Sequence, residues 1–226
     1  MAVASVEEYV SGLDRALRGP RRVKRDMLAE VRDGLCDAAE ALESGGLCRA
    51  EAERAAVEEF GAIEEIAPGY QEELIARQGR RTAALLFVGV PLTTIMWSLI
   101  WRFFPDTVTL SPVRDWPSWY LAVARTMDVM QLLTGVLGAV ALVTLGRGAR
   151  RFRRARLVTR GLGLLIWCEL PFVVGMSLAL MWGGNTGFGT FVPGLLASLV
   201  SNGLLVWQLY SASRCLTLGR ERPATA

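Results

Sequence analysis

The chain of 226 residues contains no histidine, a single lysine and only four cysteines. Without histidine, the commonest general base and the commonest metal ligand are missing. The cysteines form no C-x-x-C pair, so neither a zinc site nor a disulfide framework is predicted. No G-x-S-x-G, H-E-x-x-H or P-loop motif occurs. We therefore expect no catalytic residue, no metal, no cofactor and no enzymatic activity.

Charge and apolar residues are unevenly distributed along the chain. Residues 1–80 hold eleven basic and seventeen acidic residues, a net charge of −6, whereas residues 81–226 hold fourteen against five, a net charge of +9. The N-terminus reaches Glu7 and Glu8 without an apolar run, so no signal peptide is predicted. The pattern predicts a soluble domain at 1–80, a basic and apolar membrane domain at 81–214, and a tail at 215–226.

The first 80 residues predict a small all-α bundle. A capping box of Ser5 and Glu8 begins the first helix. Its predicted apolar face consists of Val6, Tyr9, Val10, Leu13 and Leu17. The second helix is expected from about Pro20 to Glu43, ended by Ser44-Gly45-Gly46. Its predicted apolar stripe consists of Val23, Met27, Leu28, Val31, Leu35, Ala39 and Leu42.

A third helix is predicted from Arg49 to Phe60, with Gly61 as its C-terminal stop. Its inward-facing residues are expected to be Ala52, Ala55, Ala56 and Phe60. A short turn over residues 62–66 should then lead to Pro68-Gly69, after which the chain resumes as a helix. Pro68 and Gly69 are predicted to act as a hinge between the soluble and the membrane domain.

Several residues of this segment occur in the order and spacing of a known family. They are Tyr9-x3-Leu13 with Leu17, Glu30-Val31-x3-Leu35, Gly45-Gly46-Leu47 with Glu51-Ala52, Ala55 or Ala56, and Phe60-Gly61. Residues 5–80 resemble the HAAS-type helical signalling domain, also called permease prefix domain 1. One departure is Cys48, where a capping Ser, Thr or Pro is expected, so the third helix should begin less firmly.

The resemblance implies a bacterial membrane protein that binds a protein partner through residues 5–80. In that family, the partner is expected to be a PadR-like transcriptional regulator or a component of an ABC permease. Because arginine replaces lysine almost throughout, we expect a high-GC bacterium, such as an actinobacterium, as the source. The family offers no catalytic residues to transfer to this chain.

Four apolar runs in the second part of the chain are long enough to cross a bilayer as helices. The predicted spans are residues 82–101, 127–146, 161–182 and 188–210. The first contains no charged residue over twenty positions, which is about 30 Å of α-helix. The predicted fold class is therefore all-α, with a small N-terminal bundle followed by four transmembrane helices.

The second and third spans are joined by a strongly basic segment, residues 147–160, which contains no acid. Its seven arginines are Arg147, Arg150, Arg151, Arg153, Arg154, Arg156 and Arg160. The positive-inside rule then places this loop and both termini in the cytoplasm of a bacterium, with the four helices in its inner membrane. The loop is predicted to contact anionic lipids, or alternatively to dock the acidic bundle. Direct nucleic-acid binding is disfavoured, because the loop lies against the bilayer and the bundle is acidic.

Polar residues inside the predicted spans mark a candidate intramembrane site. Glu169 lies about 13 Å into the third span, and Ser201 and Asn202 lie at a compatible depth in the fourth. The three residues could sense or bind a ligand, or Glu169 could be protonated and hold helices together. At the outer edge of the second span, Arg125 and Asp128 are spaced to form an i,i+3 ion pair.

Two functions remain open from the sequence. The first is a signalling or regulatory protein whose membrane helices anchor the bundle or sense a signal. The alternative is a small transporter, or an accessory subunit of an ABC-type exporter, that uses the polar site around Glu169. Small residues spaced four apart, such as Gly175 and Ala179, allow helices to pack closely within one chain or in a homo-oligomer.

Overall fold

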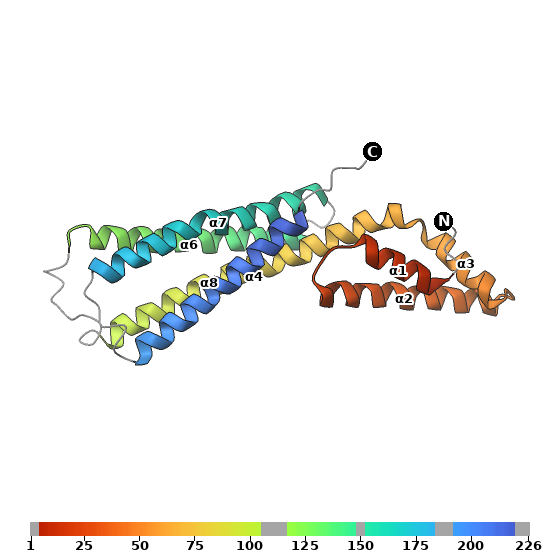
Figure 1. Ribbon diagram of the computed structural model, residues 1–226, viewed down its shortest axis with the longest axis horizontal. Coiled ribbons are helices and arrows are strands. Elements are labelled where there is room, and N and C mark those ends of the chain that lie inside the picture. Colours follow the sequence, from red (N-terminus) through yellow and green to blue (C-terminus); the bar gives the residue numbers. More distant parts are fainter. Residues whose placement is uncertain (1–4, 105–116, 148–151, 184–191, 220–226) are drawn as a thin grey trace. The chain divides into compact units, whose positions relative to one another are not determined.

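The computed structural model describes residues 5–104, 117–147, 152–183 and 192–219. Their contacts divide the chain into two units, Met1–Arg77 and Gln78–Ala226. The described residues form helices and no strand. The helices are α1 (Val6–Ala16), α2 (Arg21–Ser44), α3 (Arg49–Phe60), α4 (Ile63–Phe103), α6 (Tyr120–Arg147), α7 (Phe152–Gly183) and α8 (Val192–Gly219), drawn in Figure 1.

Helix α1 begins as the sequence predicts. Ser5 is its N-cap, and the Ser5 side chain accepts a hydrogen bond from the backbone N–H of Glu8 at 3.3 Å. Such a cap satisfies one of the backbone donors that the first turn leaves without an intrahelical partner. The five residues of the predicted apolar face, Val6, Tyr9, Val10, Leu13 and Leu17, are all buried.

Helix α2 ends in a Schellman motif. The backbone N–H of Leu47 donates to the carbonyl of Leu42 at 3.3 Å, and that of Gly46 donates to Glu43 at 2.9 Å. The motif needs a left-handed residue, and Gly46 supplies it with φ +105°. The predicted stop at Ser44-Gly45-Gly46 is therefore confirmed, and the buried residues of α2 fall on the predicted stripe, namely Met27, Leu28, Val31, Leu35 and Ala39.

Helix α3 has the predicted bounds but a weaker start. Cys48 is its N-cap, and its side chain makes no capping hydrogen bond. Ala52 and Ala56 are buried as predicted, whereas Ala55 and Phe60 are only half-buried. Val57, which the sequence pattern did not single out, joins the core instead. Small alanines let α3 lie close against α2, with which it shares a cluster around Ala39.

The chain between α3 and the membrane domain differs from the prediction. Helix α4 begins at Ile63 and continues through Pro68 and Gly69, so the expected turn at 62–66 and the restart near Tyr70 are wrong. Pro68 lies in the second turn of α4, where its missing N–H removes a single intrahelical hydrogen bond. Both residues are exposed, and water can hydrate the carbonyl left without its donor. The break that would define a hinge is absent here, and a hinge motion at this point stays a prediction.

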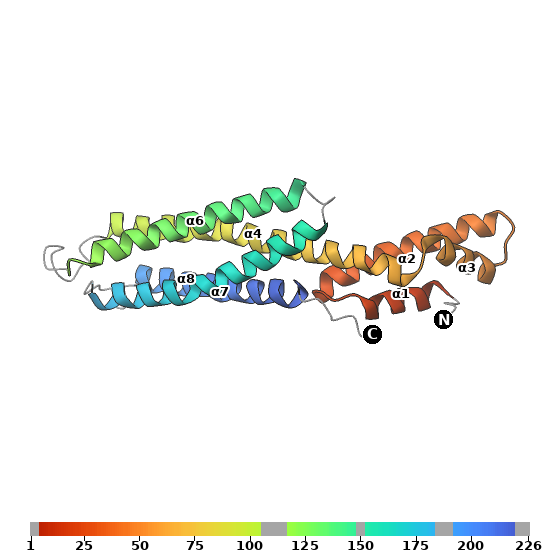
Figure 2. The same cartoon turned by 90° about the horizontal axis from the view of Figure 1, so that it is seen from above.

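In unit 2, α6 lies between α4 and α7. The Thr94 hydroxyl on α4 donates to Gln131 Oε1 on α6 at 2.9 Å. Further along α6, Gly138 has no side chain and lets the α4 backbone approach: a Cβ there would lie 3.1 Å from the carbonyl of Ala83. As residue numbers rise on α6 they fall on α4, so the two helices run antiparallel, as Figure 2 shows.

Helix α8 closes the bundle between α7 and α4. It packs along α7, and its hydrogen bonds to α4 join Gln78 to Ser211 and Trp97 to Ser201. Residue numbers rise on α4 as they fall on α8, so this pair is antiparallel as well. All four helices contribute to one buried cluster, made of Ala83, Leu86, Ala141, Leu162, Ile166 and Ala212. Unit 2 is therefore a four-helix bundle with small residues at its contacts.

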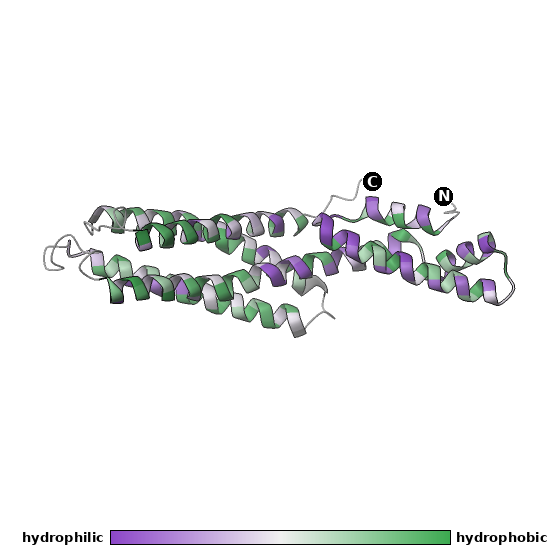
Figure 3. Cartoon of the chain, turned by 90° about the horizontal axis from the view of Figure 1, so that it is seen from below, coloured by the Kyte–Doolittle hydropathy of each residue, from purple (hydrophilic) through white to green (hydrophobic). Residues whose placement is uncertain are grey.

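The outer surface of unit 2 is apolar. Apart from Leu47, every large hydrophobic side chain found exposed lies at or beyond Phe87. Figure 3 shows the same contrast: polar residues dominate α1–α3, and apolar residues cover the long helices. Each of α4, α6, α7 and α8 is long and apolar enough to cross a membrane. The predicted all-α fold, with four long apolar helices after an N-terminal helical bundle, is confirmed.

Candidate functional site

Unit 1 is held together by Tyr9 as well as by its apolar core. The Tyr9 hydroxyl donates to the carbonyl of Gly61 at 2.9 Å, and its ring meets Phe60 edge-on, with centroids 5.8 Å apart. Gly61 has φ +107°, a conformation that side chains disfavour. Burial, followed by the negative potential of Tyr70 and Glu64, raises the pKa of Tyr9 above its usual value of 10.0. Tyr9 therefore ties α1 to the corner between α3 and α4.

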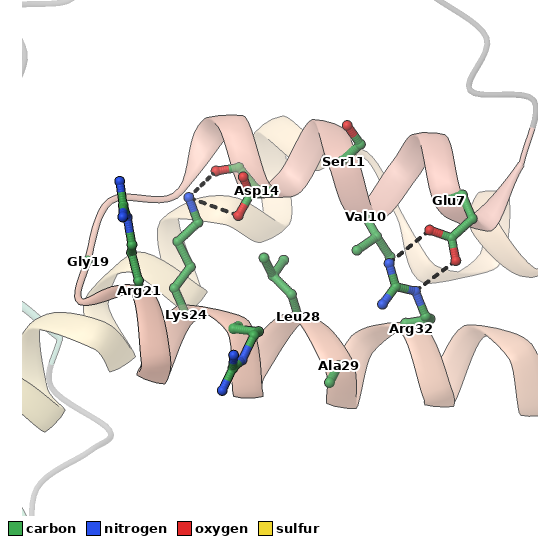
Figure 4. A pocket seen from close by; sticks show the side chains of 11 residues that line it. Glu7, Val10, Ser11, Asp14, Gly19, Arg21, Lys24, Leu28, Ala29 and Arg32 are labelled. Atoms are coloured by element: carbon green, nitrogen blue, oxygen red, sulfur yellow. Dashed lines mark hydrogen bonds and ion pairs between the residues drawn. The ribbon is translucent and has the colours of Figure 1, made fainter.

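A groove of about 480 Å³ runs between α1 and α2 (Figure 4). Two ion pairs bridge it. Arg32 donates to both carboxylate oxygens of Glu7 at 2.8 Å, and these hydrogen bonds raise the pKa of the Arg32 guanidinium. Lys24 pairs with Asp14 at 3.0 Å and also donates to the carbonyl of Leu17 at 3.1 Å. The groove is thus a bridged seam between two helices, without a nucleophile and base placed together for catalysis.

The structure places Glu169 half-buried on α7, where it accepts a hydrogen bond from the Thr134 hydroxyl of α6 at 2.7 Å. Thr134 itself is buried. The sequence did not identify Thr134, because a lone threonine in an apolar run carries little signal. A carboxyl that is hydrogen-bonded across two helices fits the role of an interhelical contact.

The other two residues of the predicted intramembrane site lie elsewhere. Ser201 accepts a hydrogen bond from the Trp97 indole at 3.0 Å, and Asn202 is exposed and donates to the carbonyl of Ser198 on its own helix. Their predicted depths along the spans are compatible, but Ser201 bonds α4 and Asn202 bonds its own helix, whereas Glu169 bonds α6. The three residues therefore do not bond one another in the described structure, and their joint action as one site stays a prediction.

The predicted ion pair between Arg125 and Asp128 is not formed. Both residues lie exposed on α6, and among the ion pairs of the described residues none joins them. An exposed pair at i,i+3 gains little free energy and loses side-chain entropy, so spacing alone is a weak predictor of it.

The basic segment 147–160 is mostly helical and not a loop. Helix α6 ends at Arg147 and α7 begins at Phe152, so Arg153, Arg154, Arg156 and Arg160 lie on α7. The physical reason is that arginine is a good helix former and residues 152–160 contain no proline or glycine. Arg150 and Arg151 lie outside the described residues, as do the side chains of Arg147, Arg153 and Arg154. The structure leaves their predicted lipid or docking contacts untested.

Arg160 also borders a groove between α7 and α8. This groove, of about 410 Å³, is lined by Arg160, Leu164, Leu216 and Thr217. Basic pockets between transmembrane helices commonly accept the head groups of anionic lipids. The lipid contact expected of the arginines stays a prediction.

A buried polar cluster that the sequence patterns did not predict joins α4 to α8. Gln78 Nε2 donates to Ser211 Oγ at 3.1 Å, the hydroxyls of Thr82 and Ser211 are 2.7 Å apart, and Thr82 Oγ1 lies 3.1 Å from Cys215 Sγ. All four side chains are buried, and we call them the polar junction. Gln78 and Ser211 fall just outside the predicted spans 82–101 and 188–210. The i,i+4 spacing of small polar residues on both helices was the available signal.

Beside the polar junction, α4 comes close to two further helices. A Cβ at Gly79 would collide with the Thr159 hydroxyl on α7 and would lie 3.0 Å from the Leu145 side chain on α6. The first turns of α4 inside unit 2 are therefore fixed by all three neighbouring helices. Any movement of this part of α4 must disturb buried hydrogen bonds and close packing together.

Among the residues that the structure describes, no group of three or more potential ligands is placed to hold a metal ion. The four cysteines are free, with Cys215 buried in the polar junction and Cys48 and Cys168 exposed. The interactions found among the described residues are those of helix packing and surface contacts.

Comparison with known proteins identifies the N-terminal unit. A family model described as HAAS matches residues 8–69, which cover α1, α2, α3 and the first turns of α4. A search of the curated proteins found no match, and a search of the solved structures found none. The resemblance carried by Tyr9, Leu13 and Phe60-Gly61 is confirmed. The chain carries a HAAS domain, followed by four helices long and apolar enough to cross a membrane.

Proposed function

We propose that this chain is a multi-pass regulatory protein of a bacterial inner membrane, whose HAAS domain binds a protein partner in the cytoplasm. The observation that carries the proposal is the presence of the HAAS match at residues 8–69 in one chain with four membrane-competent helices. The role is non-catalytic. The sequence lacks histidine and catalytic motifs, and the groove between α1 and α2 is bridged by two ion pairs.

The distribution of arginines supports a cytoplasmic HAAS domain. In unit 2, Arg80, Arg160 and Arg214 lie at the end of the bundle where α4 enters, and residues 147–160 connect helices at the same end. Arg102 and Arg125 lie toward the opposite end. Because basic residues are retained on the cytoplasmic side, the bundle is oriented with its arginine-rich end and both termini inside.

The proposed partner is a PadR-like transcriptional regulator or a component of an ABC permease. These are the partner classes that the HAAS family implies. In this scheme the bilayer part anchors the domain or senses a signal, and residues 71–81 of α4 connect the two units. A change in the packing of α4 at the polar junction would be passed along this connector to the HAAS domain.

A transporter or exporter subunit is the second candidate, and it has less support. It requires polar groups that line one path through the bilayer. The hydrogen bonds of Glu169, Ser201 and Asn202 instead divide these groups among three neighbourhoods. Water accessibility of Glu169 in the reconstituted protein would favour this alternative.

Site-specific photo-crosslinking in living cells tests the proposal. A photoreactive residue is placed at Leu47, the exposed apolar side chain of unit 1, and at Leu132, an exposed apolar side chain of α6, as the matched control. We expect a protein adduct from Leu47 that mass spectrometry identifies as a regulator or permease component, and lipid adducts alone from Leu132. Protein adducts absent from Leu47 and from further exposed positions of α2 and α3 would contradict partner binding.

A further inference from the structure

Unit 1 is acidic overall, but one end of it is strongly basic. Residues 15–25 contain six basic residues and no acid, whereas the rest of residues 1–80 contains five basic and seventeen acidic residues. These eleven residues form the last turn of α1, the connection to α2 and the first turn of α2. We call the exposed arginines among them, Arg15, Arg18, Arg21, Arg22 and Arg25, the basic turn.

The arginines of the basic turn are not fixed by close ion pairs, although Arg15 donates a hydrogen bond to the carbonyl of Ser11 within α1. Within the described part of the chain, no carboxylate forms an ion pair with Arg15, Arg18, Arg21 or Arg22, and Arg25 meets Asp26 only at 4.0 Å. Lys24 differs, because it pairs with Asp14 across the groove. Helix α2 also has no acid in its first turn and no side-chain cap. Cations at a helix N-terminus oppose the macrodipole, so these positions cost stability and call for another explanation.

The basic turn is fixed to α4 by specific contacts. The Gln71 side chain accepts from the backbone N–H of Arg18 at 2.8 Å and donates to the carbonyl of the same residue at 2.9 Å. Leu74 covers Gly19, where a Cβ would lie 3.3 Å from the leucine side chain. The turn therefore moves with the part of α4 around residues 71–74.

Only eleven residues separate Gln71 from Thr82, the first residue of the uncharged run 82–101. As part of helix α4 this distance is about 16 Å, and even a fully extended chain would span no more than about 40 Å. The basic turn is thus tethered near the head groups of the bilayer that the uncharged run enters. A tether this short gives a high effective concentration, so even weak attraction suffices for docking.

Asp14 and Asp26 lie beside the basic turn, but residues 33–60 of unit 1 hold eight acidic and only two basic residues. Arg21 and Glu43 lie at opposite ends of α2, about 33 Å apart along its axis. This separation is several Debye lengths at physiological ionic strength, so the acidic end does not cancel the basic turn at a surface. A charged surface would orient the unit by this asymmetry, with the basic turn toward negative charge.

From this combination we infer that the basic turn docks the HAAS domain on anionic lipid head groups of the membrane in which the same chain is embedded. The inference rests on the proposed function only for the membrane placement and the cytoplasmic side of unit 1, and it is independent of the protein partner. The cytoplasmic leaflet carries the anionic lipids that attract polybasic surfaces. Surfaces that bind single-stranded nucleic acids use aromatic side chains to stack on the bases, and residues 15–25 contain no aromatic residue.

Hydrogen–deuterium exchange of the full-length chain in nanodiscs tests the inference. One nanodisc contains phosphatidylcholine alone, and the other also contains phosphatidylglycerol. We expect the amides of residues 15–25 to exchange more slowly in the anionic nanodiscs, and the difference to disappear at high salt. The exposed turn at residues 44–48, at the other end of α2, should exchange equally in both lipids.

Paired variants separate the basic turn from the overall charge. Replacing Arg21 and Arg22 by glutamine should lower the docking equilibrium constant by about twenty-fivefold, since each arginine near a surface contributes about fivefold. Replacing Arg49 and Arg54 by glutamine removes the same charge from α3 and should have little effect. Replacing Arg21 and Arg22 by lysine should retain docking, and circular dichroism checks that each variant folds.

Lipid docking would be overturned if residues 15–25 exchanged equally in both lipids. It would also be overturned if replacing Arg49 and Arg54 by glutamine weakened docking as much as replacing Arg21 and Arg22. In each experiment the amides of α6 and α7 report on membrane insertion. If these are protected while residues 15–25 do not respond to lipid charge, docking alone is wrong. If they exchange rapidly in nanodiscs, the membrane placement itself is wrong, and docking falls with it.

Discussion

Tyr9 couples the stability of unit 1 to pH in the alkaline range. Because burial raises its pKa above 10.0, the folded state favours the neutral phenol. The resulting stability is fully present below the pKa of the unfolded chain and is lost as the pH rises through the higher folded value. At neutral pH the phenol also contributes its hydrogen bond to Gly61.

Replacing Tyr9 by phenylalanine is expected to destabilise unit 1 by about 1 kcal/mol at neutral pH, the usual contribution of one hydrogen bond. The same substitution should reduce the alkaline loss of stability, because only Tyr70, whose pKa burial also raises, remains as a partly buried phenol of unit 1. Amide exchange of α1 in the full-length protein, measured between pH 7 and pH 11, would show both effects. An alkaline loss identical in the variant would assign it to another group.

Two glycines of α4 have opposite surroundings. Gly79 lies against Thr159 and Leu145, whereas a Cβ at Gly69 would meet nothing within 4 Å. Replacing Gly79 by alanine should therefore lower the melting temperature of the detergent-solubilised protein, because packed helices must separate. Replacing Gly69 by alanine should leave the melting temperature unchanged or raise it, because alanine has a helix propensity up to about 1 kcal/mol more favourable than glycine. Similar effects at both positions would show that Gly79 is not closely packed.

The Gly69→Ala variant also tests the predicted hinge. The structure already has helix through Pro68 and Gly69, so a signal passed along α4 need not use a flexible break. If regulation of the partner is abolished by Gly69→Ala although the protein remains folded, bending at this point is part of the mechanism. Unchanged regulation would remove Gly69 from it.

Glu169 is predicted to act as a contact between α6 and α7 through Thr134. Glutamine keeps an acceptor oxygen at the same position, so Glu169→Gln should retain stability and regulation at every pH. Thr134→Val removes the donor and should cost about 0.5–1 kcal/mol, as hydrogen bonds between membrane helices typically do. A regulatory response that loses its pH dependence in Glu169→Gln would instead indicate that the protonation of this carboxyl is sensed.

At the scale of helices, the polar junction offers a comparison within α8. Ser211 is buried and bonds Gln78 and Thr82 of α4, whereas Ser213, two residues later, donates to the carbonyl of Leu209 on its own helix. Ser211→Ala should destabilise the bundle by about 1–3 kcal/mol, because buried groups on α4 lose their partner. Ser213→Ala should change little. Thermal unfolding in detergent measures both, and equal effects would show that α4 and α8 are not joined here.

The sequence was a good guide to elements and a poor guide to contacts between them. Periodic apolar residues and glycine stops predicted α2 and α3 closely, because both signals are local. Pro68 misled the prediction of α4, since a proline in an early turn breaks less structure than one further along. The depth of Glu169 and Ser201 in their spans is readable from sequence. Their hydrogen-bond partners, Thr134 and Trp97, are not, because the rotation of each helix about its axis is set by packing.

At the scale of the whole chain, charge is arranged in a consistent order along the sequence. A basic turn and an acidic remainder make up the HAAS domain, and the arginine-rich end of the bundle follows. In the proposed orientation, anionic head groups at the cytoplasmic surface attract both basic regions and repel the acidic end of the domain, which consists of the second half of α2 and of α3. In that orientation the acidic surface faces away from the lipid and into the cytoplasm, where a soluble protein partner can reach it. Lipid docking and partner binding can therefore use different faces of the same domain.

The topology behind this arrangement can be tested with cysteine labelling. In a background where Cys36, Cys168 and Cys215 are replaced by alanine, exposed Cys48 reports on the HAAS domain. In a second variant Cys48 is also replaced, and Ser118, exposed before α6, becomes the single cysteine. A membrane-impermeant maleimide added to intact cells should label Ser118→Cys and leave Cys48 unlabelled, whereas inverted vesicles should give the opposite result. Labelling of Cys48 in intact cells would place the HAAS domain outside. A HAAS domain outside the membrane could not reach a cytoplasmic partner. The arginine-rich end of the bundle would then also lie outside, against the positive-inside rule.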